Sequence, residues 1–366
     1  MRSLKKEKQM NIKDFFRIMK EKGASDLFIR AGGVPRLRID GKICPLGDEI
    51  ISRQDLEEIT DELIATEEQK KLYKENLEVD FAYSYDGVGR FRVIIFLQRS
   101  TPSLVARYVR EDIQTFEDLN LPAELLKRFS MEDRGIVLLT GPAGCGKSTT
   151  VASMVEYINS NYQNHIVTIE DPIEFLFKDK KSIINQRELG LDVPSYPAAL
   201  KHFTLQSPDV IFIGLIRDTQ TMHAAISAAE MGVLLLSTFH TINAIQTLER
   251  IVNFFPPHLH DEVRIQLSLV LKGIVSLRLI PRKDSPGRIP ACETMVLTPT
   301  VARIIREGKV WELKRFMEQG EMFGMQTFNQ SLVKLVKAGK ISEEDARDSS
   351  DSRDEFELEL RGIKRV

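Results

Sequence analysis

One eight-residue stretch constrains the fold of this 366-residue chain more than any other. The segment Gly141-Pro-Ala-Gly-Cys-Gly-Lys-Ser148 matches the pattern G-x-x-x-x-G-K-[S/T] of phosphate-binding loops. The apolar run 135–140 before it predicts a buried strand, and the run 147–158 after it predicts a helix. Because the pattern is meaningful only between a strand and a helix, these flanks support it. The sequence therefore predicts an α/β domain with a nucleotide phosphate site.

The chemistry of such a loop assigns roles to its residues. Backbone N–H groups and the N-terminus of the following helix surround the phosphates, so every residue of the loop is a candidate contact. Lys147 is predicted to reach the β- and γ-phosphates and to take part in catalysis, and Ser148 is predicted to ligate Mg²⁺. ATP and Mg²⁺ are therefore the expected cofactors. The predicted nucleotide contacts are Gly141, Pro142, Ala143, Gly144, Cys145, Gly146, Lys147, Ser148 and Thr149.

Composition excludes several other classes of protein. The formal net charge of -2 and the 42% hydrophobic content are typical of a globular protein and argue against a nucleic-acid motor. The three cysteines, Cys44, Cys145 and Cys292, show no metal-ligand spacing, which favours a reducing, cytoplasmic compartment. No apolar run approaches the ~20 residues of a membrane span. We therefore expect any membrane association to depend on a partner.

Polar residues follow two further strand-like runs. Glu174 closes an acidic segment after the strand 165–170, where a carboxylate can serve Mg²⁺ or water activation, although helix capping or loop solvation is the alternative. His240 and Thr241 end the apolar strand 233–239, a place suited to a sensor of the γ-phosphate, although a lone histidine can also be structural. We predict Glu174 and His240 as catalytic residues together with Lys147.

The apolar strand 210–216 departs from what a nucleotide-hydrolysing site requires. Such a strand ordinarily ends in a carboxylate that holds the Mg²⁺ shell or polarises the attacking water. Here Gly214 and Leu215 occupy those positions, and neither can accept a proton or bind a metal. The sequence therefore predicts nucleotide binding more firmly than fast hydrolysis.

The regions on either side of this domain have their own patterns. The first ~110 residues read as an α+β module with a mostly antiparallel sheet, in which Arg90, Arg92 and Arg107 either are solvated strand residues or bind nucleotide phosphates. Helical patterns follow from Thr300, and the mixed-charge segment 349–366 predicts a poorly ordered tail.

Several motifs in fixed order identify a relative. Besides the phosphate loop, the motifs are Thr168-Ile-Glu-Asp-Pro-Ile-Glu174, Pro208-Asp-Val-Ile-Phe-Ile-Gly214, Ser237-Thr-Phe-His-Thr241 and Thr300-Val-Ala-Arg-Ile-Ile-Arg-Glu307. Together they resemble the type IV pilus retraction ATPases, the PilT/PilU branch of the secretion ATPase superfamily. Details such as Phe254-Phe-Pro and Trp311-Glu-Leu-Lys are closer to the PilU subgroup.

The resemblance implies an organisation and a biological setting. It implies a PAS-like domain over 1–112, a RecA-like ATPase core over 113–298 and a helical subdomain over 299–348, followed by the tail. Six subunits would form a ring, with nucleotide between the two domains and basic contacts from Arg90, Arg92 and Arg107. The ring would lie in the cytoplasm, bound to an inner-membrane platform protein, and would drive pilus disassembly and twitching motility.

Two departures from the family pattern lead to two hypotheses about function. The family strand normally ends Gly-Glu-x-Arg, where this chain has Leu215, and the family arginine three residues before Pro208 is Leu205 here. The first hypothesis is a retraction motor with slow intrinsic turnover. The alternative is a nucleotide-binding accessory subunit that assists a paralogous, catalytically complete retraction ATPase. A pilus-extension or secretion ATPase is disfavoured because three scattered cysteines cannot form a Cys₄ metal site.

Overall fold

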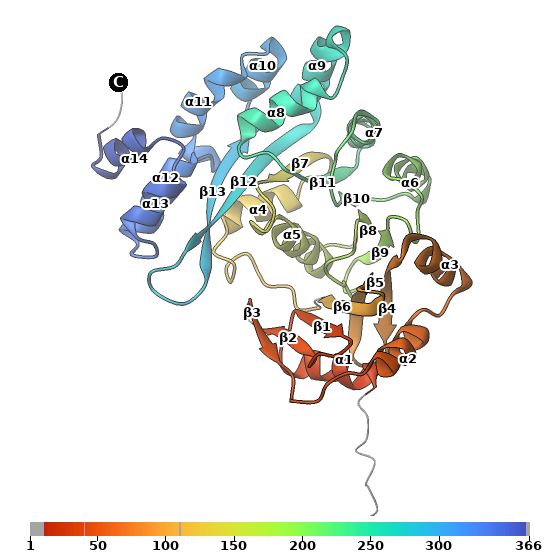
Figure 1. Cartoon of the computed structure of the whole chain (residues 1–366). Helices are drawn as coiled ribbons and strands as arrows, with labels where there is room; N and C mark the ends of the chain where they lie inside the picture. Colours follow the sequence, from red (N-terminus) through yellow and green to blue (C-terminus); the bar gives the residue numbers. More distant parts are fainter. Residues whose placement is uncertain (1–10, 40, 110, 364–366) are drawn as a thin grey trace, which may run out of the picture. The chain divides into compact units, whose positions relative to one another are not determined.

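The computed structural model describes residues 11–39, 41–109 and 111–363. The chain divides between Glu111 and Asp112 into two compact units, which are described separately (Figure 1).

The first unit is built on an antiparallel sheet. Its strand order among the described residues is β3-β2-β1-β6-β5-β4, and every neighbouring pair runs antiparallel. The strands are β1 (Asp26–Arg30), β2 (Arg36–Ile39), β3 (Lys42–Pro45), β4 (Glu78–Tyr85), β5 (Gly89–Gln98) and β6 (Thr101–Val109). The helices are α1 (Ile12–Glu21), α2 (Arg53–Leu63) and α3 (Glu67–Asn76).

Local sequence signals account for the helices of this unit. The apolar side chains of α1 recur at helical spacing, and Ile12, Phe15, Phe16 and Met19 are all fully buried. At the start of α3, Thr66 and Gln69 form the reciprocal capping box that their spacing predicts.

The second unit contains a mainly parallel sheet, in agreement with the predicted α/β class. Its order in the described part of the chain is β13-β12-β7-β11-β10-β8-β9. All neighbouring pairs are parallel except β12 and β13, which form an antiparallel edge. The strands are β7 (Gly135–Thr140), β8 (His165–Glu170), β9 (Ile183–Glu188), β10 (Val210–Ile213), β11 (Leu234–Phe239), β12 (Leu271–Pro281) and β13 (Arg288–Val296).

Helices cover both faces of this sheet. Alternate residues of β7 point to opposite sides, so Ile136 and Leu138 join one apolar cluster while Val137 and Leu139 join another. The helices up to the end of β12 are α4 (Ala123–Ser130), α5 (Lys147–Asn161), α6 (Tyr196–Phe203), η1 (Thr204–Gln206), α7 (Thr219–Glu230), α8 (Ala244–Asn253), η2 (Pro257–Leu259) and α9 (His260–Val270).

A helical region ends the second unit and corrects one prediction. It comprises α10 (Pro299–Glu307), η3 (Val310–Glu312), α11 (Leu313–Gln319), η4 (Glu321–Phe323), α12 (Phe328–Lys337), α13 (Glu343–Ser349) and α14 (Arg353–Leu360). The predicted poorly ordered tail over 349–366 is wrong for α14, although 364–366 lie outside the described residues. The side chain of Phe356 is fully buried against apolar residues of α12 and α13. The sequence analysis missed this helix because most neighbours of Phe356 in the sequence are charged.

None of the helices in the described ranges has both the length and the apolarity that crossing a membrane requires.

Candidate nucleotide site

The phosphate loop lies between β7 and α5, as predicted. β7 ends at Thr140, and α5 begins at Lys147, directly after Gly146 in the left-handed region at φ 98°. Gly141 has φ 140°, and a Cβ there would lie 2.5 Å from the backbone oxygen of Leu277. Only glycine, which has no Cβ, can lie this close to β12 without displacing the β12 backbone. The close contact explains why the loop begins with glycine.

A cavity of about 430 Å³ lies beside this loop, at the carboxyl ends of the parallel strands. That is where nucleotide sites form in parallel α/β sheets, and its volume is within the usual range for small-molecule pockets. Its walls include loop residues and residues at or just after the ends of β8, β10 and β11, namely Ala143, Gly144, Gly146, Lys147, Ser148, Thr149, Glu170, Glu174, Gly214, Leu215, Thr238 and His240.

Lys147 and His240 meet at one wall of the cavity. The Lys147 ammonium donates to the backbone oxygens of Gly141 at 2.7 Å and Pro142 at 2.9 Å, and its Nζ lies 3.5 Å from Nδ1 of His240. Burial lowers the pKa of Lys147. Burial and then the Lys147 charge lower the pKa of His240, which favours a neutral imidazole at neutral pH. The structure thus brings the two predicted residues together at the cavity, and their contact with phosphate stays a prediction.

Ser148 and Glu174 form a second pair. The Ser148 hydroxyl donates to a Glu174 carboxylate oxygen at 2.9 Å. Hydroxyl and carboxylate oxygens are the hard ligands that Mg²⁺ prefers, and this ion usually takes its remaining ligands from water and phosphates. The described residues contain no group of three His, Cys, Asp or Glu side chains able to hold a metal by themselves. The oxygen pair therefore fits Mg²⁺ bound jointly with a nucleotide.

Glu170 and Tyr196 are among the cavity residues to which the sequence analysis assigned no role. Glu170 is buried at the end of β8 and accepts hydrogen bonds from the Thr168 hydroxyl at 2.7 Å and the Gln186 amide at 3.1 Å. Burial raises its pKa to about 7. Tyr196 lines the cavity from α6, and its buried hydroxyl has no hydrogen-bond partner among the described residues. The position of Glu170 at a strand end was the available signal, whereas α6 was not predicted.

Leu215 lies in the wall of the same cavity as the phosphate loop. The backbone before it is fixed, since the Gly214 N–H donates to the Ile169 oxygen at 2.7 Å and the Gly214 oxygen accepts from the Thr238 hydroxyl at 2.6 Å. A half-buried aliphatic side chain thus stands two residues after β10, which ends at Ile213 and is shorter than the predicted strand 210–216.

The remaining predicted contacts lie elsewhere. Gly141, Pro142 and Cys145 belong to the loop but not to the cavity lining. Arg90 and Arg92 lie on β5 and Arg107 on β6, all in the first unit. Arg92 pairs with Asp80, and Arg107 pairs with Asp26 at 2.8 Å. Contacts between these arginines and nucleotide stay a prediction.

Comparisons with known proteins agree with the geometry. Residues 90–347 match the family described as "Type II/IV secretion system protein". The chain is 43% identical to the type IV pilus ATPase PilU of Pseudomonas aeruginosa over 96% of its own length and 92% of that protein. It is 38% identical to the type IV pilus retraction ATPase PilT of the same organism, over 95% of this chain and 100% of PilT.

A solved structure supports the same relationship. The crystal structure of the pilus retraction motor PilT with bound ADP is similar to this chain with a TM-score of 0.88 and 40% identity. The similarity covers 95% of this chain and 99% of that one. The fold, the phosphate loop and these likenesses together show that the chain belongs to the type II/IV secretion ATPase family, in its PilT/PilU branch of type IV pilus ATPases.

Proposed function

We propose that this protein is an ATP-binding motor of type IV pilus retraction whose intrinsic hydrolysis is slow. Its subunits form a hexameric ring that couples ATP hydrolysis to pilus disassembly and twitching motility. The observation that carries the proposal is that Leu215 and the phosphate loop line one cavity. Binding and water activation depend on different groups, so a site with an intact loop and no carboxylate at 215 binds ATP but hydrolyses it slowly.

The cavity residues have separate roles in phosphate binding, Mg²⁺ binding and hydrolysis. Backbone N–H groups of the loop and the N-terminus of α5 hold the phosphates, and Lys147 exchanges its loop carbonyls for phosphate oxygens. Ser148 and Glu174 would hold Mg²⁺, which would neutralise phosphate charge. His240 contacts the γ-phosphate as a neutral donor. Leu215 cannot take a proton from water, and lack of a general base costs about 10²–10⁴ in rate.

The wider arrangement follows the same proposal. Residues 1–112 form the PAS-like domain, 113–298 the ATPase core and 299–348 a helical subdomain. Arg90, Arg92 and Arg107 supply basic contacts to the nucleotide. The ring works in the cytoplasm and reaches the inner membrane through the pilus platform protein.

Phosphate release from the purified protein tests this function. We expect slow release that Lys147→Ala abolishes, because the loop then lacks its phosphate-binding ammonium. Leu215→Glu should raise the rate at least about tenfold by restoring a proton acceptor. Leu215→Gln is the matched control, because glutamine has the shape and polarity of glutamate but cannot act as a general base. Equal rates for the wild type and Leu215→Glu would contradict the assignment of the site.

The absence of a carboxylate at 215 also favours a second candidate. In it, the protein binds nucleotide and assists a catalytically complete, paralogous retraction ATPase. Leu205, which replaces a family arginine, is 80% exposed and offers no charge for a phosphate. ATP binding without measurable release, together with faster release by a complete relative on mixing, would favour this candidate over the motor.

A further inference from the structure

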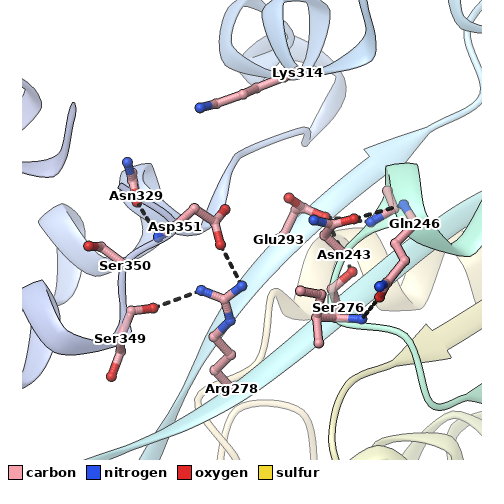
Figure 2. Close-up of polar contacts among 12 residues, drawn as sticks. Asn243, Gln246, Ser276, Arg278, Glu293, Lys314, Asn329, Ser349, Ser350 and Asp351 are labelled. Carbon is pink, nitrogen blue, oxygen red and sulfur yellow. Dashed lines mark hydrogen bonds and ion pairs between the residues drawn. The ribbon is translucent and has the colours of Figure 1, made fainter. Parts of the chain in front are cut away.

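A buried carboxyl group outside the nucleotide cavity is hydrogen-bonded to two parts of the chain that lead to cavity residues. Glu293 lies on β13 and is only 6% exposed. One of its oxygens, Oε1, accepts hydrogen bonds from the backbone N–H of Ala244 at 2.8 Å and from the Ser276 hydroxyl at 3.3 Å. Figure 2 shows Glu293 beside Ser276 and the start of α8. Because a buried carboxylate is costly, its retention here calls for an explanation.

The first connection leads to the phosphate loop. Ser276 pairs with Thr140 across the β12–β7 ladder, and the Thr140 hydroxyl donates to the Ser276 hydroxyl at 2.9 Å. Thr140 is the last residue of β7 and immediately precedes Gly141. The Gly141 oxygen accepts a hydrogen bond from the Lys147 ammonium. The hydrogen-bonded line from Glu293 through Ser276 to Thr140 therefore ends beside a predicted phosphate ligand.

The second connection leads to the segment that carries His240. Ala244 is the first residue of α8, so the Glu293 carboxylate takes one of the N–H groups that a helix start leaves unpaired. Only three residues separate Ala244 from His240. The Thr241 hydroxyl in turn bonds that of Thr247 at 2.6 Å, which fixes this segment to the helix.

We propose that Glu293 is a positioning residue for nucleotide binding. By holding Thr140 through Ser276 and α8 through Ala244, it sets the separation of the Lys147 ammonium and the His240 imidazole, which is 3.5 Å here. The proposal rests on the nucleotide site of the proposed function. It assigns to Glu293 no contact with the nucleotide itself.

The surroundings of Glu293 distinguish this role from an ordinary ion pair. Arg278, on the same strand as Ser276, binds the Ser349 oxygen at 2.7 Å and the Asp351 carboxylate at 2.5 Å. Its guanidinium also lies 3.7 Å from the Phe328 ring centre. Figure 2 shows Arg278 directed toward Ser349 and Asp351. Arg278 is thus engaged with Ser349 and Asp351, whereas Glu293 is held by its hydrogen bonds from Ala244 and Ser276.

Binding of a fluorescent methylanthraniloyl-ADP to the full-length protein tests the proposal without requiring turnover. Glu293→Leu should weaken binding by about tenfold, because the Ala244 N–H and the Ser276 hydroxyl lose their acceptor. Glu293→Gln retains an oxygen at the same place and should bind within about threefold of the wild type. Ser331→Ala is the matched control, since the Ser331 hydroxyl accepts from the Cys292 N–H at 3.0 Å and has no part in this line.

The expected pattern separates positioning from general stability. Ser331→Ala and Glu293→Leu should both lower the unfolding temperature, but only Glu293→Leu should weaken binding. If Glu293→Leu does not fold, Thr140→Val cuts the line at its other end and should weaken binding by about threefold. Equal affinity of these variants and the wild type would overturn the proposal, as would equal weakening by Ser331→Ala. A wild type that does not bind the probe would instead overturn the proposed function.

Discussion

Glu170, Glu293 and His240 each lie where burial is the largest influence on the pKa. Burial raises the pKa of both carboxyl groups to about 7 and lowers that of the imidazole. All three shifts favour the neutral form of the side chain. The two carboxyl groups therefore change charge near neutral pH.

Glu293 gives a pH dependence of known sign. Its pKa is raised from 4.5 to about 7, mainly by burial and also by the Asp351 charge, against the opposing effects of the Ala244 and Ser276 hydrogen bonds and Arg278. The folded protein keeps this proton at pH values where the unfolded chain has lost it. Its contribution to stability is therefore complete below about pH 4.5 and is lost as the pH rises through about 7.

Glu293→Gln removes this titration. The free energy of unfolding of the variant, relative to the wild type, should rise by up to about 3 kcal/mol from about pH 5 to about pH 8. Urea unfolding across this range measures it. A flat difference between Glu293→Gln and the wild type across this range would contradict the assignment.

Tyr196 gives a second prediction for a single residue. Its hydroxyl is buried without a hydrogen-bond partner in the described part of the chain, and burial raises its pKa to about 12. An unpaired buried hydroxyl costs about 1–3 kcal/mol, so Tyr196→Phe should leave the free energy of unfolding unchanged or raise it by about 1 kcal/mol. A loss of stability, measured by urea unfolding, would reveal a polar partner for this hydroxyl.

Sequence patterns predicted the contiguous part of the site and not the rest. The phosphate loop could be recognised because its pattern and flanks are local. Leu215 could be recognised because it follows an apolar run, although β10 itself ends two residues earlier, at Ile213. Glu293 could not be recognised, because its partners Ser276 and Ala244 lie on other elements. Tyr196 lies on α6, which the sequence analysis missed although the buried residues of this eight-residue helix, Tyr196, Ala199, Leu200 and Phe203, recur at helical spacing.

Among the elements, periodic segments were predicted better than short or edge segments. The strands β7, β8 and β11 are buried along nearly their whole length and contain apolar runs that stood out. In contrast, β9 alternates exposed and partly buried residues and was missed. The helix α8 was also missed, although it has an asparagine cap and one buried face. Antiparallel pairing of β12 with β13 is a tertiary feature, and the apolar character of these strands does not specify it.

The helix α14 provides a test at the level of an element. Phe356 is fully buried in a cluster with residues such as Phe328 and Leu332. Phe356→Ala should lower the free energy of unfolding by about 3–5 kcal/mol, because it removes apolar contacts and leaves a cavity. Phe323→Ala, at a 43% exposed side chain, should cost much less. Similar costs for both variants in urea unfolding would contradict the docking of α14.

For the whole molecule, the proposed ring can be tested directly. Large apolar side chains are exposed in the single chain, among them Leu269 at 69%, Trp311 at 69% and Met322 at 84%. Exposed apolar surface of this kind favours association. Light scattering with ATP and Mg²⁺ should give six times the mass of one chain, and Lys147→Ala should weaken this assembly. A single-chain mass at micromolar concentration with ATP would contradict the ring.

The buried position of Phe356 has a practical consequence for protein production. The match to the secretion ATPase family stops at residue 347, yet α14 begins at Arg353 and covers apolar side chains of α12 and α13. A recombinant protein truncated after residue 347 would lack α14 and would expose this apolar surface to solvent. We expect such a shortened version to precipitate at concentrations where the full-length polypeptide stays in solution.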